Sequence, residues 1–302
     1  PSPAMGRKRK GKPINGWVIL DKPLGRSSAW AVGQVRHITG AAKAGHGGTL
    51  DPLATGVLPI ALGEATKTVS YIQDGTKIYG FVLRWGQATE TDDSEGAVVE
   101  TSDHRPTEAE ILAALSAFTG EIAQAPPAYS AIKIDGKRAY ALARDGKAPE
   151  MVPRIVRVDR FDWRGSPTAD TSEFVVECGK GTYIRSLARD LARALGTVGH
   201  VASMRRLAVG TMTEKDAISL ERLGEVVHSA APDGYLHPVE TALADIPALD
   251  LTGPQAQRLR AGQVVQAPNA NPGAVCAMAD GLPVALGHVE DGEVRAVRVF
   301  NL

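Results

Sequence analysis

One stretch limits how this chain can fold more than any other: the glycine-rich segment 45–59, GHGGTLDPLATGVLP. Its glycines allow the backbone to turn sharply or to pass close to another group. Pro52 lacks an amide hydrogen and biases Asp51 toward an extended backbone. The segment therefore predicts a tight loop that holds Asp51 at the start of an apolar run. Two interpretations stay open: Asp51 is an ordinary turn or cap residue, or it is a carboxylate that performs chemistry.

The length of 302 residues, with 43% hydrophobic and 23% charged residues, predicts one large globular domain and a small one. The only cysteines, Cys178 and Cys276, form neither a disulfide framework nor a cysteine zinc site. The sequence has no apolar run of about 18 residues and no signal peptide ahead of the first apolar segment. We therefore expect a protein of the reducing cytoplasm that does not interact with a membrane.

The charge is balanced overall, with 34 basic and 34 acidic residues, so composition does not favour nucleic-acid binding. Its distribution is uneven. Residues 7–12, RKRKGK, form a basic arm, and residues 90–110 are acidic. Such an arm is typical of a phosphate-binding tail and equally of a solubilising, disordered terminus.

Hydrophobic periodicity and turn signals predict the order of the elements. The alternation over 77–85 places Tyr79 on an aromatic strand face, where it is either a core residue or a residue at the strand's start that reaches a cleft. Strands are predicted at 16–20, 56–62, 77–85, 128–134, 155–163, 173–178 and 200–207, and helices at 27–40, 63–72, 107–120, 140–144, 184–195 and 218–230. From residue 246 on, short strands punctuated by glycine predict a small β-rich domain. The predicted domains are a basic disordered arm (1–13), a catalytic domain (14–240) and a β-rich domain (246–302).

The motifs of several enzyme classes are missing from the sequence. There is no G-x-S-x-G, no H-E-x-x-H, no close cysteine pair and no P-loop. What remains is cofactor-free chemistry by a carboxylate, for example at a sugar carbon. Arg185 lies at the edge of the apolar face of the predicted helix 184–195. It either needs a carboxylate or phosphate partner or extends its head into solvent.

Several ordered motifs together resemble the TruB family, the tRNA pseudouridine-55 synthases. They are segment 45–59, DKPLG (21–25), GEATK (63–67), YSAIK (129–133), DGKRAY (135–140), KGTYIR (180–185) and RRLAV (205–209). The resemblance covers roughly residues 14–210. Residues 246–302 are similar only in character to the small β-barrel, PUA-like RNA-binding domains of this family.

The resemblance implies an α+β fold with a mixed, mainly antiparallel sheet flanked by helices. It also implies isomerisation of uridine 55 in the T-loop of tRNA to pseudouridine, by base flipping and without cofactor or metal. Asp51 corresponds to the essential carboxylate, Tyr79 to the tyrosine that stacks on the target base, and Arg185 to the arginine paired with the aspartate. The implied partner is the T-arm of tRNA, and we expect a monomer.

The resemblance also assigns RNA-binding residues. His46 matches a loop histidine that helps to hold the flipped-out RNA, and Lys67, Asp93 and Tyr183 fall where family residues line the site. Met204 stands where a leucine is common. Because the net charge is zero, RNA binding requires a local basic face, for which the candidates are residues 7–12, Lys133, Lys137, Arg138, Arg205 and Arg206.

Three other functions stay open at this point. A non-catalytic tRNA-binding or RNA-folding protein of the same fold has no need of Asp51. The guide-RNA-dependent branch of the superfamily is less well matched, because the C-terminus lacks a long basic tail. A glycosidase acting on sugars requires a second carboxylate beside Asp51, which the sequence does not place.

Overall fold

The computed structural model describes residues 11–130, 133–134, 137–138, 151–229 and 234–302. The predicted helical turn at 140–144, the middle of the predicted strand 128–134 and the start of the basic arm lie outside these residues. Within them, no helix is both long enough and apolar enough to cross a lipid bilayer.

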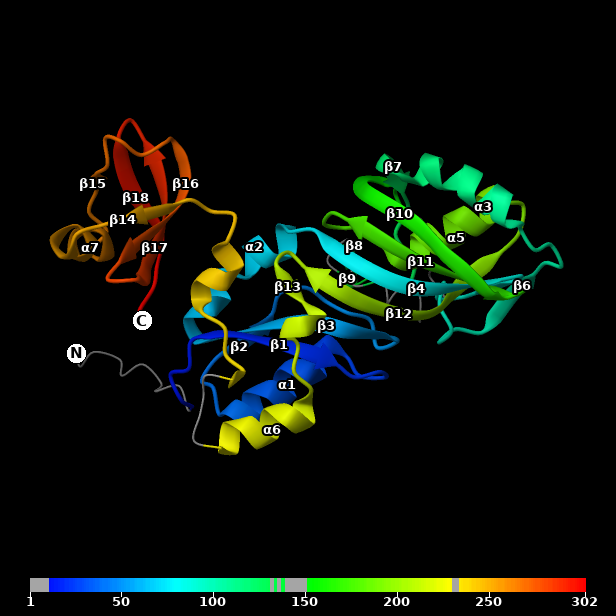
Figure 1. Cartoon of the computed structure of the whole chain (residues 1–302), viewed down its shortest axis with the longest axis horizontal. Helices are drawn as coiled ribbons and strands as arrows, with labels where there is room; N and C mark the ends of the chain where they lie inside the picture. Colours follow the sequence, from blue (N-terminus) through cyan, green and yellow to red (C-terminus); the bar gives the residue numbers. More distant parts are fainter. Residues whose placement is uncertain (1–10, 131–132, 135–136, 139–150, 230–233) are drawn as a thin grey trace.

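A large mixed sheet forms the body of the molecule (Figure 1). Its central path runs β1-β3-β12-β4-β11-β10-β7, with β2 beside β3 and β13 beside β12. Only β12 and β3 are parallel, and every other neighbouring pair is antiparallel. The predicted mixed, mainly antiparallel sheet is therefore confirmed. The strands are β1 (Gly16–Lys22), β2 (Ala44–His46), β3 (Ala54–Leu62), β4 (Lys77–Trp85), β7 (Gly120–Gln124), β10 (Arg154–Thr168), β11 (Thr171–Cys178), β12 (Gly199–Val209) and β13 (Met212–Thr213).

Helices flank the sheet at both ends (Figure 1). Helix α1 (Ser28–Thr39) begins at the Ser27 cap and ends at Gly40, which adopts the left-handed conformation. It lies beside α6 (Leu220–His228). Helix α5 (Ile184–Ala194) packs on β12 and buries Ile184, Leu187 and Leu191, as its periodicity predicts. The remaining helices of this part are α2 (Val69–Asp74), α3 (Glu108–Ala114), and the 3₁₀ segments η1 (Gly63–Lys67), η2 (Leu115–Phe118), η3 (Glu214–Asp216) and η5 (Val239–Leu243).

Three predictions of local structure are wrong. The predicted loop after β4 contains β5 (Gln87–Thr89), which pairs with β6 (Val98–Thr101). Leu112, expected on the inner face of its helix, is half exposed because α3 is short and covers the sheet with Ile111 and the following turn. Residues 128–130 form bends rather than a strand. Within the described residues the predicted strand keeps only β8 (Lys133–Ile134), which pairs with β9 (Lys137–Arg138) in a short hairpin.

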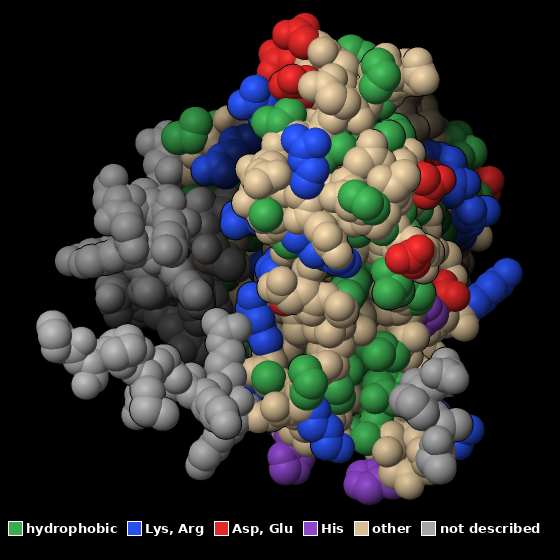
Figure 2. Space-filling model, turned by 90° about the vertical axis from the view of Figure 1, so that its left-hand side faces the viewer, with side chains coloured by type: hydrophobic (Ala, Val, Ile, Leu, Met, Phe, Trp, Pro, Cys, Tyr) green, Lys and Arg blue, Asp and Glu red, His purple; other side chains and the backbone are tan. Residues whose placement is uncertain are grey.

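The chain ends in a five-stranded curled sheet of order β14-β16-β17-β18-β15, covered by α7 (Gly253–Arg260). Its strands are β14 (Ala248–Asp250), β15 (Val265–Gln266), β16 (Gly273–Ala279), β17 (Leu282–Glu290) and β18 (Glu293–Val299). Figure 2 faces this end of the molecule and shows basic side chains spread over it, with acidic ones at the upper edge and on the right-hand side. Phe300 inserts between the two sheets and joins a core with Trp17 and Ile19 of β1. This shared core ties the small sheet to the large one.

Candidate active site

A pocket of about 310 Å³ opens over the centre of the large sheet. Its volume falls at the lower end of the range of small-ligand sites, about 300–1,000 Å³. Five parts of the chain line it: the loop carrying Asp51, helix α2 with Gln73, strand β4 with Lys77 and Tyr79, strand β12 with Met204 and Arg206, and residues 179–185 leading into α5. Because β3, β12 and β4 are neighbours in the sheet, segments far apart in sequence meet here.

The loop that carries Asp51 is fastened on both sides. The Ser28 hydroxyl accepts a hydrogen bond from the Leu50 amide (2.8 Å) and donates one to the Leu50 carbonyl (2.9 Å). The Gly47 amide donates to the carbonyl of Pro59 (2.8 Å). These bonds fix the loop against α1 and β3, so that Asp51 projects into the pocket with about a third of its side chain exposed.

The predicted partner of Asp51 is present. Arg185 Nε lies 2.9 Å from Asp51 Oδ2, and its two terminal nitrogens donate to the carbonyls of Thr91 (2.8 Å) and Tyr129 (3.0 Å). Within the described residues, Nε itself makes no aligned hydrogen bond, so the contact with Asp51 is one of charge. The guanidinium is buried and locked by two carbonyls, and it therefore stabilises the ionised carboxylate without moving.

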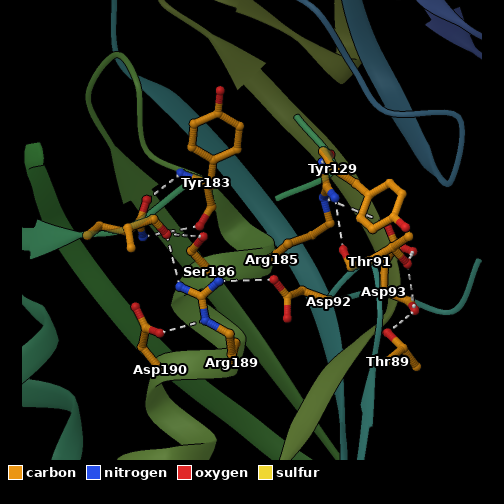
Figure 3. A network of polar contacts seen from close by, with 12 residues as sticks. Thr89, Thr91, Asp92, Asp93, Tyr129, Tyr183, Arg185, Ser186, Arg189 and Asp190 are labelled. Carbon is orange, nitrogen blue, oxygen red and sulfur yellow. Dashed lines mark hydrogen bonds and ion pairs between the residues drawn. The ribbon is translucent and has the colours of Figure 1, made fainter. Parts of the chain in front are cut away.

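A second arginine, Arg189, supports the first from one helical turn further along α5 (Figure 3). It donates to Asp92 (3.0 Å), Asp190 (2.8 Å) and the Ala125 carbonyl (2.9 Å). Arg185 and Arg189 therefore both bind the segment 89–93, which also carries Asp93. Arg189 escaped sequence reasoning, although its spacing of four from Arg185 places both on one helix face.

Asp93 lies behind the ion pair rather than in the pocket. Its carboxylate is almost fully buried, 3.7 Å from Arg185 Nε. It accepts hydrogen bonds from the Thr91 hydroxyl (2.5 Å) and the Glu95 amide (3.0 Å). Asp93 therefore faces the same guanidinium as Asp51 from the protein interior.

Two tyrosines border the pocket. Tyr79 is partly buried, and burial raises its pKa, while the charge of Arg206 opposes that rise. Tyr183 stands at the N-terminus of α5, where Gln124 binds both its amide (2.8 Å) and its carbonyl (3.2 Å). Burial and the Asp51 charge raise the pKa of Tyr183. Both phenols therefore face the carboxylate in their neutral form at neutral pH.

Three other predicted residues lie outside this pocket. His46 lies on β2, and burial, together with the charge of Arg206, lowers its pKa. Lys67 donates to Glu64 (2.6 Å) and to the Val299 carbonyl (2.8 Å), where the two sheets join. Arg205 is half exposed and forms ion pairs with Asp21 and Glu214. Arg205 lines a neighbouring cavity instead, which it shares with Met204.

Arg206 was wrongly expected on an exposed basic face, because its side chain is 1% exposed. It donates to the carbonyls of Val57 (2.8 Å), Gly48 (3.1 Å) and Thr49 (3.3 Å). The alternation of side chains along β12 indicates the burial of Arg206, because Met204, Arg206 and Ala208 all point to the buried face. The side chains of Lys133, Lys137 and Arg138 lie outside the described residues.

Two lysines near the pocket are also buried. Lys22 donates to the carbonyls of Arg26 (2.7 Å) and Pro23 (2.9 Å), and burial lowers its pKa to about 8. Burial likewise lowers the pKa of Lys77, which lines the pocket, to about 8. Within the described part of the chain, no group of three or more histidine, cysteine, aspartate or glutamate residues is arranged to bind a metal. The chemistry offered is that of one ionised carboxylate with a fixed guanidinium and neutral phenols, which suits nucleophilic or base catalysis.

Comparison with known proteins agrees with this geometry. Two family models match the chain, the N-terminal domain of the TruB family pseudouridylate synthases over residues 36–184 and the tRNA pseudouridylate synthase B C-terminal domain over residues 185–244. The tRNA pseudouridine synthase B of Gluconacetobacter diazotrophicus is 59% identical over 261 residues, covering 86% of this chain and 85% of the relative. The enzyme of the same name from Rhodospirillum rubrum is 50% identical over 308 residues, covering 99% and 100%.

Solved structures agree on the fold. An H/ACA ribonucleoprotein bound to a substrate RNA containing 2'-deoxyuridine matches with a TM-score of 0.75 at 23% identity, covering 99% of this chain and 92% of that one. At this identity the likeness concerns the fold alone. The family models span most of the chain and the bacterial relatives are at least half identical to it. The chain therefore belongs to the TruB family of pseudouridylate synthases.

Proposed function

We propose that this enzyme isomerises uridine 55 in the T-loop of tRNA to pseudouridine, with Asp51 as the reacting carboxylate. The observation that carries the proposal is the ion pair between Asp51 and the buried Arg185 at the mouth of a nucleotide-sized pocket. The names of the bacterial relatives support tRNA as the substrate.

The reaction breaks the bond between the ribose C1' and the uracil N1 and forms a bond between C1' and the uracil C5. Asp51 either attacks the ribose or removes a ribose proton, and the freed base turns before it rejoins. The C5 proton is then lost and the freed N1 takes up a proton, so that no oxidation state changes and no group is added. A guanidinium fixed beside the carboxylate stabilises the charged form that both routes need.

A uridine inside a folded loop reaches Asp51 only if the base leaves its stack. Flipping a base costs a few kcal/mol, and stacking on an aromatic side chain returns about 1–3 kcal/mol. Tyr79 lines the pocket and supplies that surface. Because its phenol is neutral, we assign it to stacking and, as a hydrogen-bonding acceptor, to passage of the C5 proton.

The other contacts with RNA follow from position. We assign Tyr183 and Met204 to the pocket wall, His46 to the RNA beside the target, and the five-stranded sheet to tRNA outside the T-arm. Lys67, at the junction of the sheets, and Arg205, in ion pairs, contact RNA only if these bonds open. We expect a cytoplasmic monomer that acts without a guide RNA.

The decisive experiment uses an unmodified tRNA transcript with tritium at uridine C5. We expect tritium release by the parent and none by Asp51→Asn, with tRNA affinity retained. A transcript with cytidine at position 55 should release none. If the parent binds tRNA and releases no tritium, the alternative of a non-catalytic tRNA-binding or RNA-folding protein replaces the proposal.

A further inference from the structure

Arg206 occupies a position that the reaction as described leaves without a role. It lies at the centre of the large sheet, on β12, with Gly56 of β3 opposite it on one side and Tyr79 of β4 on the other. The two strands that flank it lead to the two pocket residues proposed to handle the substrate. No other residue of β12 is in register with both Tyr79 and the strand that follows the Asp51 loop.

The Arg206 guanidinium donates its hydrogen bonds to backbone carbonyl groups. Its Nε and terminal nitrogens donate to Val57, Thr49 and Gly48, of which the last two lie in the loop that carries Asp51. Within the described residues, the guanidinium makes no ion pair with a carboxylate. Burying a charge without a counterion costs free energy, and the hydrogen bonds to the carbonyl oxygens offset this cost.

The same charge reaches both sides of the pocket. The charge of Arg206 lowers the pKa of His46 at the start of the loop and opposes the rise in the pKa of Tyr79. Arg206, which lines the pocket, therefore binds the Asp51 loop through Gly48 and Thr49 and lies directly opposite Tyr79 on the neighbouring strand.

We propose that Arg206 is a positioning residue that sets the Asp51 loop and the Tyr79 phenol relative to each other. It touches neither ribose nor base in this role. It acts by holding the carbonyls of Gly48 and Thr49 on one side and the phenol on the other. The activity measurement that tests this proposal rests on the proposed function, whereas the measurement of the Asp51 loop does not.

The test compares Arg206→Met and Arg206→Lys with the parent. The methionine removes all donors, and the lysine keeps the charge but not the planar fork that serves three acceptors. Arg105→Met is the matched control, because Arg105 also donates to two backbone carbonyls, those of Ser102 (2.7 Å) and His104 (3.1 Å). Arg105 lies outside the pocket.

Two quantities are measured on each variant: amide hydrogen exchange of residues 45–53, and single-turnover tritium release together with tRNA affinity. In Arg206→Met we expect exchange of the Gly47 and Leu50 amides to rise about tenfold, and turnover to fall about a hundredfold, as misplacement of a reacting group by about 1 Å does. Affinity should stay within about threefold of the parent. Arg206→Lys should fall between, and Arg105→Met should change neither quantity.

Each departure from this pattern has a meaning. Unchanged loop exchange in both Arg206 variants overturns the proposal, even if turnover falls. A loss of tRNA affinity with unchanged single-turnover rate also overturns it. If Arg206→Met does not fold, Arg206→Lys carries the same comparison. If the parent releases no tritium, the proposed function fails, and the exchange measurement alone decides whether Arg206 holds the loop.

Discussion

Arg185 Nε lies 2.9 Å from Asp51 Oδ2, although Asp51 precedes β3, an early strand of the large sheet, and Arg185 follows β11, a late one. The arginine reaches the carboxylate from the first turn of α5, and two carbonyls hold its other nitrogens. The arginine is thus fixed on a helix and the loop of Asp51 is held by hydrogen bonds to Ser28 and Pro59, and a charge fixed in this way stabilises a neighbouring carboxylate most effectively.

This arrangement predicts the behaviour of Arg185→Lys. A lysine keeps the charge but loses the fork that holds Thr91 and Tyr129 while facing Asp51. We expect turnover to fall by about 10²–10³-fold, the cost of removing one preorganised electrostatic contact. Single-turnover tritium release and filter binding of tRNA measure the rate and the affinity separately.

The control is Arg193→Lys, about two turns further along the same helix, where the exposed side chain pairs with Glu100. That variant should match the parent in both quantities. Equal loss of rate and affinity in Arg185→Lys, or loss of affinity alone, contradicts a role in supporting Asp51.

Buried Lys22 predicts how stability depends on pH. Its pKa is about 8 in the folded chain and 10.5 when unfolded, because burial lowers it and the charges of Asp51 and Glu95 only partly oppose that shift. Between these values the unfolded chain binds more protons, so stability rises with pH across the window, by at most about 1.4 kcal/mol per pH unit from this group. Lys77 adds a change of the same sign.

Urea unfolding of the parent and of Lys22→Met at about pH 8 and about pH 10 measures this slope. The variant loses hydrogen bonds at both pH values, so only the difference between the two slopes counts. The parent should gain more stability than the variant as pH rises, and Lys22→Met should keep the part due to Lys77. If stability rises equally with pH in the parent and in Lys22→Met, the assignment of this pH dependence to Lys22 is contradicted.

Local signals predicted most of the fold. The Ser27 cap and Gly40 stop bound α1 as expected, and alternation over β4 places Tyr79, Phe81 and Leu83 on one face. These features depend on residues near each other in sequence. The β5–β6 ribbon escaped because both strands are short and β6 is exposed, so that hydrophobic alternation is too weak to reveal them.

The site was predicted less completely than the fold. The pairing of Asp51 with Arg185 follows only from the family resemblance, because the need of a buried guanidinium for a partner does not identify the carboxylate. The burial of Arg206 does not follow from its residue type, because basic residues are seldom fully buried. Only the neighbouring strands show that it faces backbone carbonyls. Lys67 shows the same limit, since its acceptor is a carbonyl of β18 from the far end of the chain.

The junction of the two sheets predicts the effect of Phe300→Ala. Phe300 is 1% exposed and packs in a core shared with β1 and η5. Removing its ring should cost about 3–5 kcal/mol, and it should loosen the five-stranded sheet from the large one. Thermal unfolding and limited proteolysis are the measurements, with faster cleavage expected in residues 246–302.

Val297→Ala is the comparison for this change, because Val297 is 62% exposed on the neighbouring strand. Exposed substitutions of this kind stay within about 0.5 kcal/mol of the parent. If Phe300→Ala unfolds and is cleaved like Val297→Ala, the shared core does not hold the sheets together.

Gly56 of β3 follows the Asp51 loop and lies between β1 and β12, where a side chain has no room. Its φ is +96°, and a Cβ there would lie 2.3 Å from the Arg206 carbonyl oxygen and 3.0 Å from the Arg206 nitrogen. Gly56→Ala must therefore either strain the backbone or push β3 from β12, and both move the loop that precedes β3. We expect a lower melting temperature and, in the fraction that stays folded, slower tritium release.

Gly33→Ala is the matched substitution, because Gly33 lies in the middle of α1 with an ordinary helical backbone and nothing within 4 Å of the added carbon. There the alanine should stabilise the chain by about 0.5–1 kcal/mol, since it reduces the freedom of the unfolded state. Opposite signs for the two glycines are thus expected from one measurement of thermal unfolding. A Gly56→Ala variant as stable and active as the parent would mean that β3 and β12 can separate at Gly56 without moving Asp51.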